Sequence, residues 1–195
     1  MRLLKFVYRG IMTGMPFLVY NPYSRINFHS PFTISPKSLY INYKLDIEQL
    51  NLVASKNSSG KKIKFKGKDL TVVALDNYDF EKADITFFAA GSSIAEKYAK
   101  NASKKTVVID NSKYFRMDKD VPLIVPEVNS EDIKRHKNII ANPNCSTIQM
   151  VLALKPLHEK FNIKRIVVST YQAVSGAGKA AMDELVSQTK DFLDK

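Results

Sequence analysis

The sequence has one cysteine, Cys145, and this scarcity excludes an internal disulfide. Without a disulfide framework, a reducing cytoplasm is the expected compartment. No metal site is expected either. One cysteine and the scattered His29, His136 and His158 provide no spacing of ligands that a metal ion would need.

Long hydrophobic runs are also missing. No apolar stretch approaches the ~20 residues that a helix needs to cross a bilayer, so we expect no membrane partner. Arg2, Lys5 and Arg9 precede an apolar patch at Gly10–Tyr20, but no small-residue cleavage site follows it. A signal peptide is therefore not expected.

Acidic residues are fewer than basic ones, 19 against 30, which gives a formal net charge of +11. A basic balance can mark a nucleic-acid partner. The densest basic run, Lys61–Lys68, alternates apolar and basic residues and predicts a half-exposed hairpin with Gly67 in its turn. No nucleic-acid-binding motif accompanies the charge. We therefore favour a lysine-rich solvated surface, or attraction for anionic substrates and cofactors, over a basic nucleic-acid-binding module.

The chain divides into two unlike parts near residue 45. Residues 1–44 hold four of the eight prolines and no sustained helical period, although a short strand at Leu3–Tyr8 would fit. From residue 46 onward the pattern is regular. It predicts hairpin strands at Ile63–Phe65 and Leu70–Leu75, strands at Asp84–Ala90, Thr106–Asp110, Val121–Val125, Asn138–Ala141 and Lys164–Tyr171, and helices at Ile94–Lys100, after an N-cap at Ser130, at Cys145–Lys160 and from Lys179 onward.

Strands that alternate with helices predict an α/β fold with a Rossmann-like, mostly parallel sheet. Continuous apolar strands such as Asp84–Ala90 fit this class, because helices cover both faces of a parallel sheet. The helix at Cys145–Lys160 is apolar on most sides, and we expect it to be largely buried.

The lone cysteine lies at the expected start of that helix. Asn142 is placed to cap the helix, with Pro143 at its first position and Cys145 in its first turn. The positive end of the helix dipole and the free N–H groups there favour a thiolate nucleophile. A small buried residue at a helix start is the alternative, and local physics leaves both open. None of the three histidines is well placed as an acid/base partner.

Three sets of residues resemble segments of one known family. Asn142–Met150 resembles the nucleophile segment of aspartate-semialdehyde dehydrogenases, and Ser169–Gly178 resembles a second segment of that family. A third comprises Ile109–Ser112, Phe115–Asp118 and Val125–Asn129. Their order and spacing also fit, so the resemblance covers about residues 46–195.

The resemblance implies NADP-dependent conversion of L-aspartyl 4-phosphate to aspartate semialdehyde and phosphate, a step toward lysine, methionine and threonine. It implies a thioester on Cys145, substrate contacts at Arg116, Gln172 and Asn144, and a homodimer. It also implies three regions: an atypical segment 1–44, an NAD(P)-binding domain 45–144, and the truncated start of an α+β substrate and dimerisation domain 145–195. The cofactor contacts that it implies are Ser58, Gly91, Ser92, Ser175 and Gly176.

Several features depart from the family. The only candidate for its glycine-rich turn is Gly10–Gly14, and Pro16 and Pro22 block the helix that should follow, which would leave a gap at the centre of the sheet. Asn57 stands where an arginine is common, which leaves NADP or NAD open. The family's acid/base histidine and carboxylate-binding arginine have no counterpart before Lys195. We therefore expect little activity from this chain, and a non-catalytic remnant of a shifted reading frame is an alternative.

Overall fold

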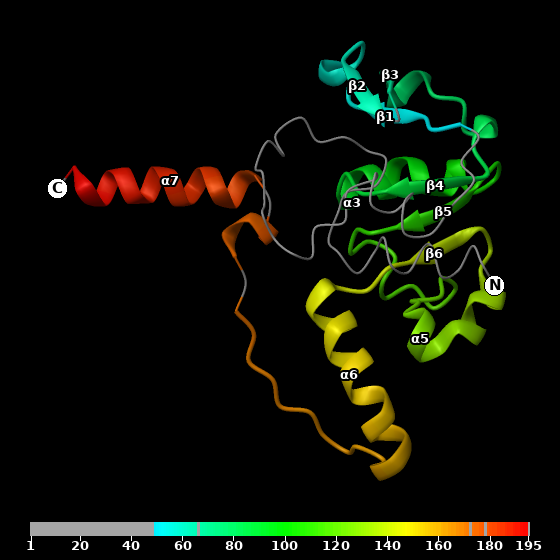
Figure 1. Ribbon diagram of the computed structural model, residues 1–195, viewed down its shortest axis with the longest axis vertical. Helices are drawn as coiled ribbons and strands as arrows, with labels where there is room; N and C mark the ends of the chain where they lie inside the picture. The colour runs from blue at the N-terminus through cyan, green and yellow to red at the C-terminus, as the bar shows by residue number, and fades with distance from the viewer. Residues whose placement is uncertain (1–48, 66, 172, 178, 195) are drawn as a thin grey trace. The chain divides into compact units, whose positions relative to one another are not determined.

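The computed structural model describes residues 49–65, 67–171, 173–177 and 179–194 (Figure 1). The chain forms two compact units, Met1–Lys160 and Phe161–Lys195. The predicted strand Leu3–Tyr8, the turn Gly10–Gly14 and the side chain of Gln172 lie outside the described residues. No helix among the described residues is long and apolar enough to span a membrane.

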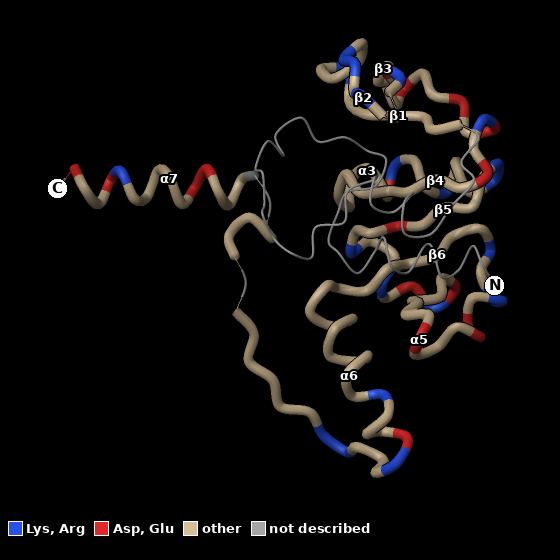
Figure 2. The backbone as a smooth tube through the Cα atoms, in the orientation of Figure 1, with Lys and Arg blue, Asp and Glu red and all other residues tan. Residues whose placement is uncertain are grey.

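The first sheet contains β1 (Leu52–Ala54), β2 (Lys62–Phe65) and β3 (Lys68–Ala74), in the order β1-β3-β2. β1 pairs with β3 in parallel, and β2 pairs with β3 as the predicted antiparallel hairpin. Gly67 in the connection has φ of 78°, a left-handed conformation that glycine adopts without strain. Lys61, Lys62 and Lys64 are exposed, so the hairpin of β2 and β3 presents basic side chains to solvent. Figure 2 marks the basic positions of this hairpin in blue.

The second sheet contains β4 (Ile85–Phe88), β5 (Val107–Asp110) and β6 (Ile139–Ala141), which are parallel throughout. Three of the predicted strands are therefore confirmed. Phe88 lies opposite Asp110, and Asp110 opposite Ala141, so the three strands end side by side. Whatever follows each strand is placed at one common edge of the sheet.

Both faces of this second sheet are covered, as expected for parallel strands. A continuous helical segment, Ser92–Ala102, lies over one face, where its fully buried Ala95 and Ala99 pack against Phe88 and Val108. Ile109 and Ile140 point to the opposite face and pack with Ile124 and Ile133. The alternation along each strand thus produces two separate apolar layers.

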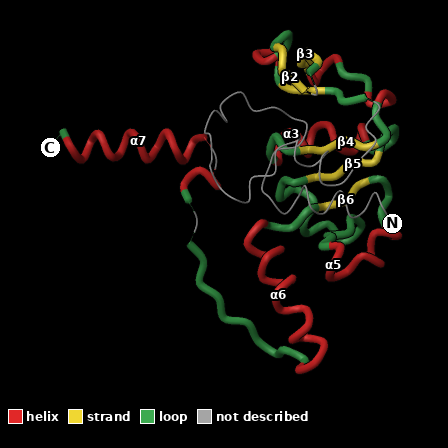
Figure 3. The backbone as a smooth tube through the Cα atoms, viewed as in Figure 1, coloured by secondary structure: helices red, strands yellow, loops and turns green. Residues whose placement is uncertain are grey.

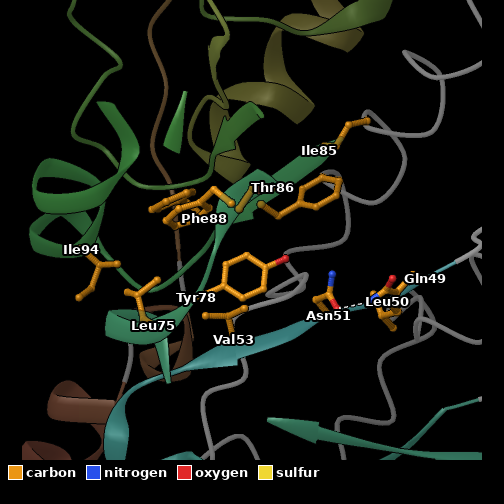
Figure 4. Close-up of a pocket in the computed structure, with 12 residues that line it drawn as sticks. Gln49, Leu50, Asn51, Val53, Leu75, Tyr78, Ile85, Thr86, Phe88 and Ile94 are labelled. Atoms are coloured by element: carbon orange, nitrogen blue, oxygen red, sulfur yellow. Dashed lines mark hydrogen bonds between the residues drawn. The ribbon is translucent and has the colours of Figure 1, made fainter. Parts of the chain in front are cut away.

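The two sheets are distinct among the described strands, and a pocket lies between β1 and β4. Val53 of β1 and Thr86 and Phe88 of β4 line it, together with Leu75 and Tyr78 (Figure 4). In a doubly wound sheet a central strand separates neighbours of this kind. The predicted gap at the centre of the sheet depends on residues 1–44, which lie outside the described residues, so it stays a prediction.

Two predictions about residues 121–135 are wrong. Val121–Val125 forms only one isolated bridge, Leu123 to Ala141, because the bounding Pro122 and Pro126 have no N–H to extend a ladder. The next helical segment begins at Pro126, as α5 (Pro126–Asn129), and continues as a 3-10 turn to Arg135. Ser130 therefore lies inside the helical segment and does not cap it.

α6 (Cys145–Phe161) begins at the predicted residue, but it is less buried than predicted. Only Ile148 is buried, where it packs against Val125, and Leu157 and Phe161 are exposed. Pro156 lies inside the helix. Several apolar side chains of α6 are therefore not covered by contacts with the described residues.

The unit Phe161–Lys195 contains one long helix. α7 (Lys179–Leu193) confirms the predicted helix, but the stripe residues Leu185, Val186 and Leu193 are exposed. The predicted strand Lys164–Tyr171 is wrong, because this segment is an exposed loop without regular structure (Figure 3). A strand needs a neighbouring edge, and the described residues supply none to it.

Candidate active site

The connections that follow β4, β5 and β6 lie at one edge of the sheet. Asn111 N donates to Phe88 O at 2.8 Å, and Asn142 N donates to Asp110 O at 2.8 Å. These bonds extend the parallel ladder by one residue beyond each strand. Ligands of open α/β sheets bind outside the carboxyl ends of the strands, so this edge is the candidate site.

Three residues separate β6 from Cys145, which is the first residue of α6 and has an exposed side chain. The helix is capped by Asn144, whose Oδ1 accepts from Ser146 N at 3.0 Å and Thr147 N at 3.4 Å. The predicted cap, Asn142, is wrong because its side chain is engaged with the neighbouring strand. The thiol therefore lies in the first turn, one residue after the cap, as the sequence predicted for a nucleophile.

Arg116 is held beside this thiol by two backbone carbonyls. Its Nε donates to Asn142 O at 2.9 Å and its Nη2 to Asn111 O at 3.1 Å. Burial lowers the pKa of the guanidinium, while the negative charges of Asp110 and Cys145 act to raise it. This electrostatic coupling shows that the fold brings the predicted anion-binding residue and the predicted nucleophile together.

Asp110 organises the loop that carries Arg116. Its fully buried carboxyl accepts from Ser112 N at 3.1 Å and from Ser112 Oγ at 2.7 Å. Burial raises the pKa of Asp110, against the bonds from Ser112 and the charge of Arg116. The fully buried carboxyl of Asp110 and the exposed thiol of Cys145 thus both interact electrostatically with the half-buried Arg116.

No role was predicted for Asn111 from the sequence, and Asn142 was predicted to cap the helix. Asn142 is 3% exposed, and its Nδ2 donates to Asn111 Oδ1. The Oδ1 of Asn142 has no hydrogen-bond partner among the described residues. Their position after adjacent parallel strands was the signal that could have identified them.

Two features fit the binding of a phosphate-bearing cofactor. Gly91 follows β4 with φ of 94° and ψ of 171°, and a Cβ built there meets nothing within 4 Å. Its backbone can therefore be approached closely at the start of the helix that continues through Ser92. Ser58, in the turn after β1, is fully buried, and its Oγ has no partner among the described residues. An orphaned buried hydroxyl of this kind is available to a ligand.

The other candidates are not brought to this edge by any described contact. Ser175 and Gly176 lie in a 3-10 turn, Val174–Ala177, of the unit Phe161–Lys195. His136 accepts from Asn138 N through its Nδ1, and His158 is exposed on α6. Among the described residues, no group of three His, Cys, Asp or Glu side chains is placed to hold a metal ion.

Residues 39–136, which are 98 of the 195 residues, match the family model of the semialdehyde dehydrogenase NAD-binding domain. The chain belongs to the semialdehyde dehydrogenase family. Residues 154–195 match the dimerisation domain of the same family. The Rossmann-like class expected from the sequence is thereby confirmed.

Within this family the chain is similar to aspartate-semialdehyde dehydrogenases. The enzyme of Aquifex aeolicus is 57% identical over 152 residues, which cover 76% of this chain and 45% of that protein. A crystal structure of aspartate semialdehyde dehydrogenase II from Vibrio cholerae complexed with ASA matches with a TM-score of 0.72 and 46% identity, over 80% of this chain and 47% of that one. The enzyme of Candida albicans with NADP matches at 0.50 and 32% identity, over 60% and 40%. The chain thus spans about half the length of these relatives.

Proposed function

We propose that this chain carries the part of an aspartate-semialdehyde dehydrogenase active site that supplies the cysteine nucleophile and binds the substrate phosphate. The observation that carries the proposal is the hydrogen bond of Arg116 Nε to Asn142 O, three residues before Cys145, which places the guanidinium near the thiol at the carboxyl edge of the sheet. The reaction is the reductive dephosphorylation of L-aspartyl 4-phosphate to aspartate semialdehyde, a step of lysine, methionine and threonine synthesis. Relatives named for this activity support the choice of substrate.

The chemistry assigns a role to each group at the edge. The thiolate of Cys145 attacks the acyl carbon of the aspartyl phosphate, the C–O bond to phosphate breaks, and a thioester forms. Arg116 binds the phosphate and stabilises it as it leaves, because a planar guanidinium offers paired donors to phosphate oxygens. Asn144 and Gln172 orient the substrate. A bound NADPH would supply the hydride for reduction of the acyl carbon, and Cys145 would hold that acyl group as a thioester and serve as its leaving thiolate.

We propose the cofactor contacts on the basis of the two features described above. Gly91 and Ser92 would contact the cofactor where the backbone is accessible, and the orphaned hydroxyl of Ser58 would donate to one of its oxygens. Ser175 and Gly176 are the further cofactor contacts that the resemblance implies. NADP is favoured over NAD by the NADP-bound relative, although Asn57 replaces the arginine that is common in the family.

The roles that we propose for the two parts of the chain follow the two family models. Residues 45–144 would bind the cofactor, and residues 145–195 would begin the substrate and dimerisation domain. Leu185 and Leu193 are 50% and 73% exposed on α7, a surface that a homodimer would cover. A cytoplasmic location is proposed with the biosynthetic role.

Mass spectrometry of the full chain tests the proposal. Incubation with aspartyl 4-phosphate should add an aspartyl group to Cys145, and hydroxylamine should remove it, as expected of a thioester. Cys145→Ser should abolish this product. Arg116→Ala should slow its formation by about tenfold or more, because charge-assisted bonds to phosphate contribute roughly 1.5–3 kcal/mol.

Turnover is a separate measurement on the same chain. Acylation without turnover would support the proposal. An unlabelled Cys145 in folded protein, or labelling that is indifferent to Arg116→Ala, would refute it.

A further inference from the structure

We propose that Asn142 is a positioning residue, whose side-chain amide pairs with Asn111 and fixes Arg116 beside Cys145. This inference rests on the proposed function of Cys145 and Arg116. It concerns a residue that touches neither the sulfur nor the anion and that acts through its neighbours.

Folding alone does not account for the amide of Asn142. The side chain is 3% exposed, and its Oδ1 has no partner among the described residues. Burying an unsatisfied acceptor is unfavourable, and each such group in a native protein calls for an explanation. Its other half, Nδ2, donates to Asn111 Oδ1, so the amide is used to join two strand ends.

The same two asparagines hold Arg116 through their main chains. The Nε of Arg116 donates to Asn142 O at 2.9 Å, and Nη2 donates to Asn111 O at 3.1 Å. Two bonds to one planar guanidinium set the direction of its plane as well as its position. The side-chain bond between the asparagines fixes the separation of the two carbonyls, and therefore the direction in which the remaining N–H donors point.

Asn142 also links this arrangement to the nucleophile. Its backbone N donates to Asp110 O at 2.8 Å, and only Pro143 and Asn144 separate it from Cys145. Pro143 is buried and has a restricted φ, so the connection has little freedom. A shift of Asn142 would consequently displace Arg116 and the start of α6 together.

The test uses the full chain and two measurements. The first is solvent exchange of the Arg116 Nε–H by NMR, with the resonance assigned by its loss in Arg116→Lys. The second is protection of Cys145 from iodoacetamide by inorganic phosphate. The variants are Asn142→Ala, Asn111→Ala and the double variant. Asn101→Ala is the matched control, because this exposed asparagine lies on the helix Ser92–Ala102, away from the amide pair.

Each single variant should speed Nε–H exchange and weaken phosphate protection by about threefold or more, a typical size of coupling within one hydrogen-bond network. The double variant should be no worse than either single one, because both remove the same bond. The control should behave as the wild type. A merely structural role would lower thermal stability and leave the exchange of Arg116 unchanged.

Unchanged Nε–H exchange in folded Asn142→Ala, or effects that add in the double variant, would overturn the inference. If Asn142→Ala does not fold, Asn111→Ala removes the same hydrogen bond by changing a residue that is exposed. Faster exchange without any phosphate protection in the wild type would support the positioning role and refute the proposed function. Phosphate protection in the wild type, together with unchanged Nε–H exchange in the variants, would support the proposed function and refute the positioning role.

Discussion

Replacement of Asn144 by alanine is expected to lower the free energy of unfolding by about 1 kcal/mol, the usual effect of losing an N-cap. The Oδ1 of Asn144 accepts one well-placed bond, from Ser146 N at 3.0 Å, and one long bond, from Thr147 N at 3.4 Å. Because Asn144 is exposed, little packing is lost with the side chain. The whole change therefore comes from the cap.

Asn144→Asp is the matched variant. A carboxylate accepts the same two bonds and interacts favourably with the helix dipole, so its stability should stay within about 0.5 kcal/mol of the wild type. Thermal and urea unfolding followed by circular dichroism measure both variants. A loss of about 1 kcal/mol corresponds to roughly 2–4 °C in Tm for a chain of this size.

The aspartate variant also separates stability from function. It keeps the cap but loses the Nδ2 donor and places a negative charge beside Cys145, so acylation by aspartyl phosphate should slow without a change in Tm. Equal destabilisation by aspartate and alanine, or none by alanine, would refute the assignment of Asn144 as the cap of α6.

Three further predictions concern the core and the site. Ile148→Ala should cost about 2–5 kcal/mol and Ile148→Val about 0.5–1.5, since the side chain is 1% exposed; equal urea midpoints would contradict this. Because burial raises the pKa of Asp110, the wild type should gain stability relative to Asp110→Asn as pH falls through that raised pKa, and lose it as pH rises; the opposite slope in pH-dependent unfolding would show the sign to be wrong. Gly91→Ala should cost about 1–3 kcal/mol in thermal unfolding through backbone strain alone, because a Cβ there meets no atom within 4 Å; an unchanged Tm would exclude that strain.

The parallel sheet could be predicted because its strands are short apolar runs that are buried on both faces. Asp84–Ala90 and Thr106–Asp110 contain too few polar residues to leave either face in water, and both supply residues to the two apolar layers of the second sheet. Once these strands are placed, the carboxyl edge follows, and with it the proximity of Arg116 to Cys145. The resemblance identified the same residues by their order in the motifs.

Two predictions were wrong because the structure at those positions depends on contacts with residues that are distant in sequence. The run from Ile166 to Thr170 has strong β propensity, but a strand forms only where another edge is available, and here the run is exposed. Asn142 and Asn144 flank the same proline, and both satisfy the sequence requirements for an N-cap. Only the contact with Asn111, on another strand end, decides between them.

The contacts of the guanidinium favour arginine over lysine at position 116. Asp110 is fully buried and partly offsets the cost of burying the guanidinium, which still has a pKa lowered by its surroundings. A lysine would retain the positive charge, but its single ammonium group lacks the planar fork that bonds Asn111 O and Asn142 O while offering further donors to a phosphate. The two carbonyls would then lose their shared partner, and the start of α6 would lose its link to β5. In the proposed site, binding of the phosphate and placement of the thiol would therefore both depend on the planar guanidinium that bonds the two strand ends.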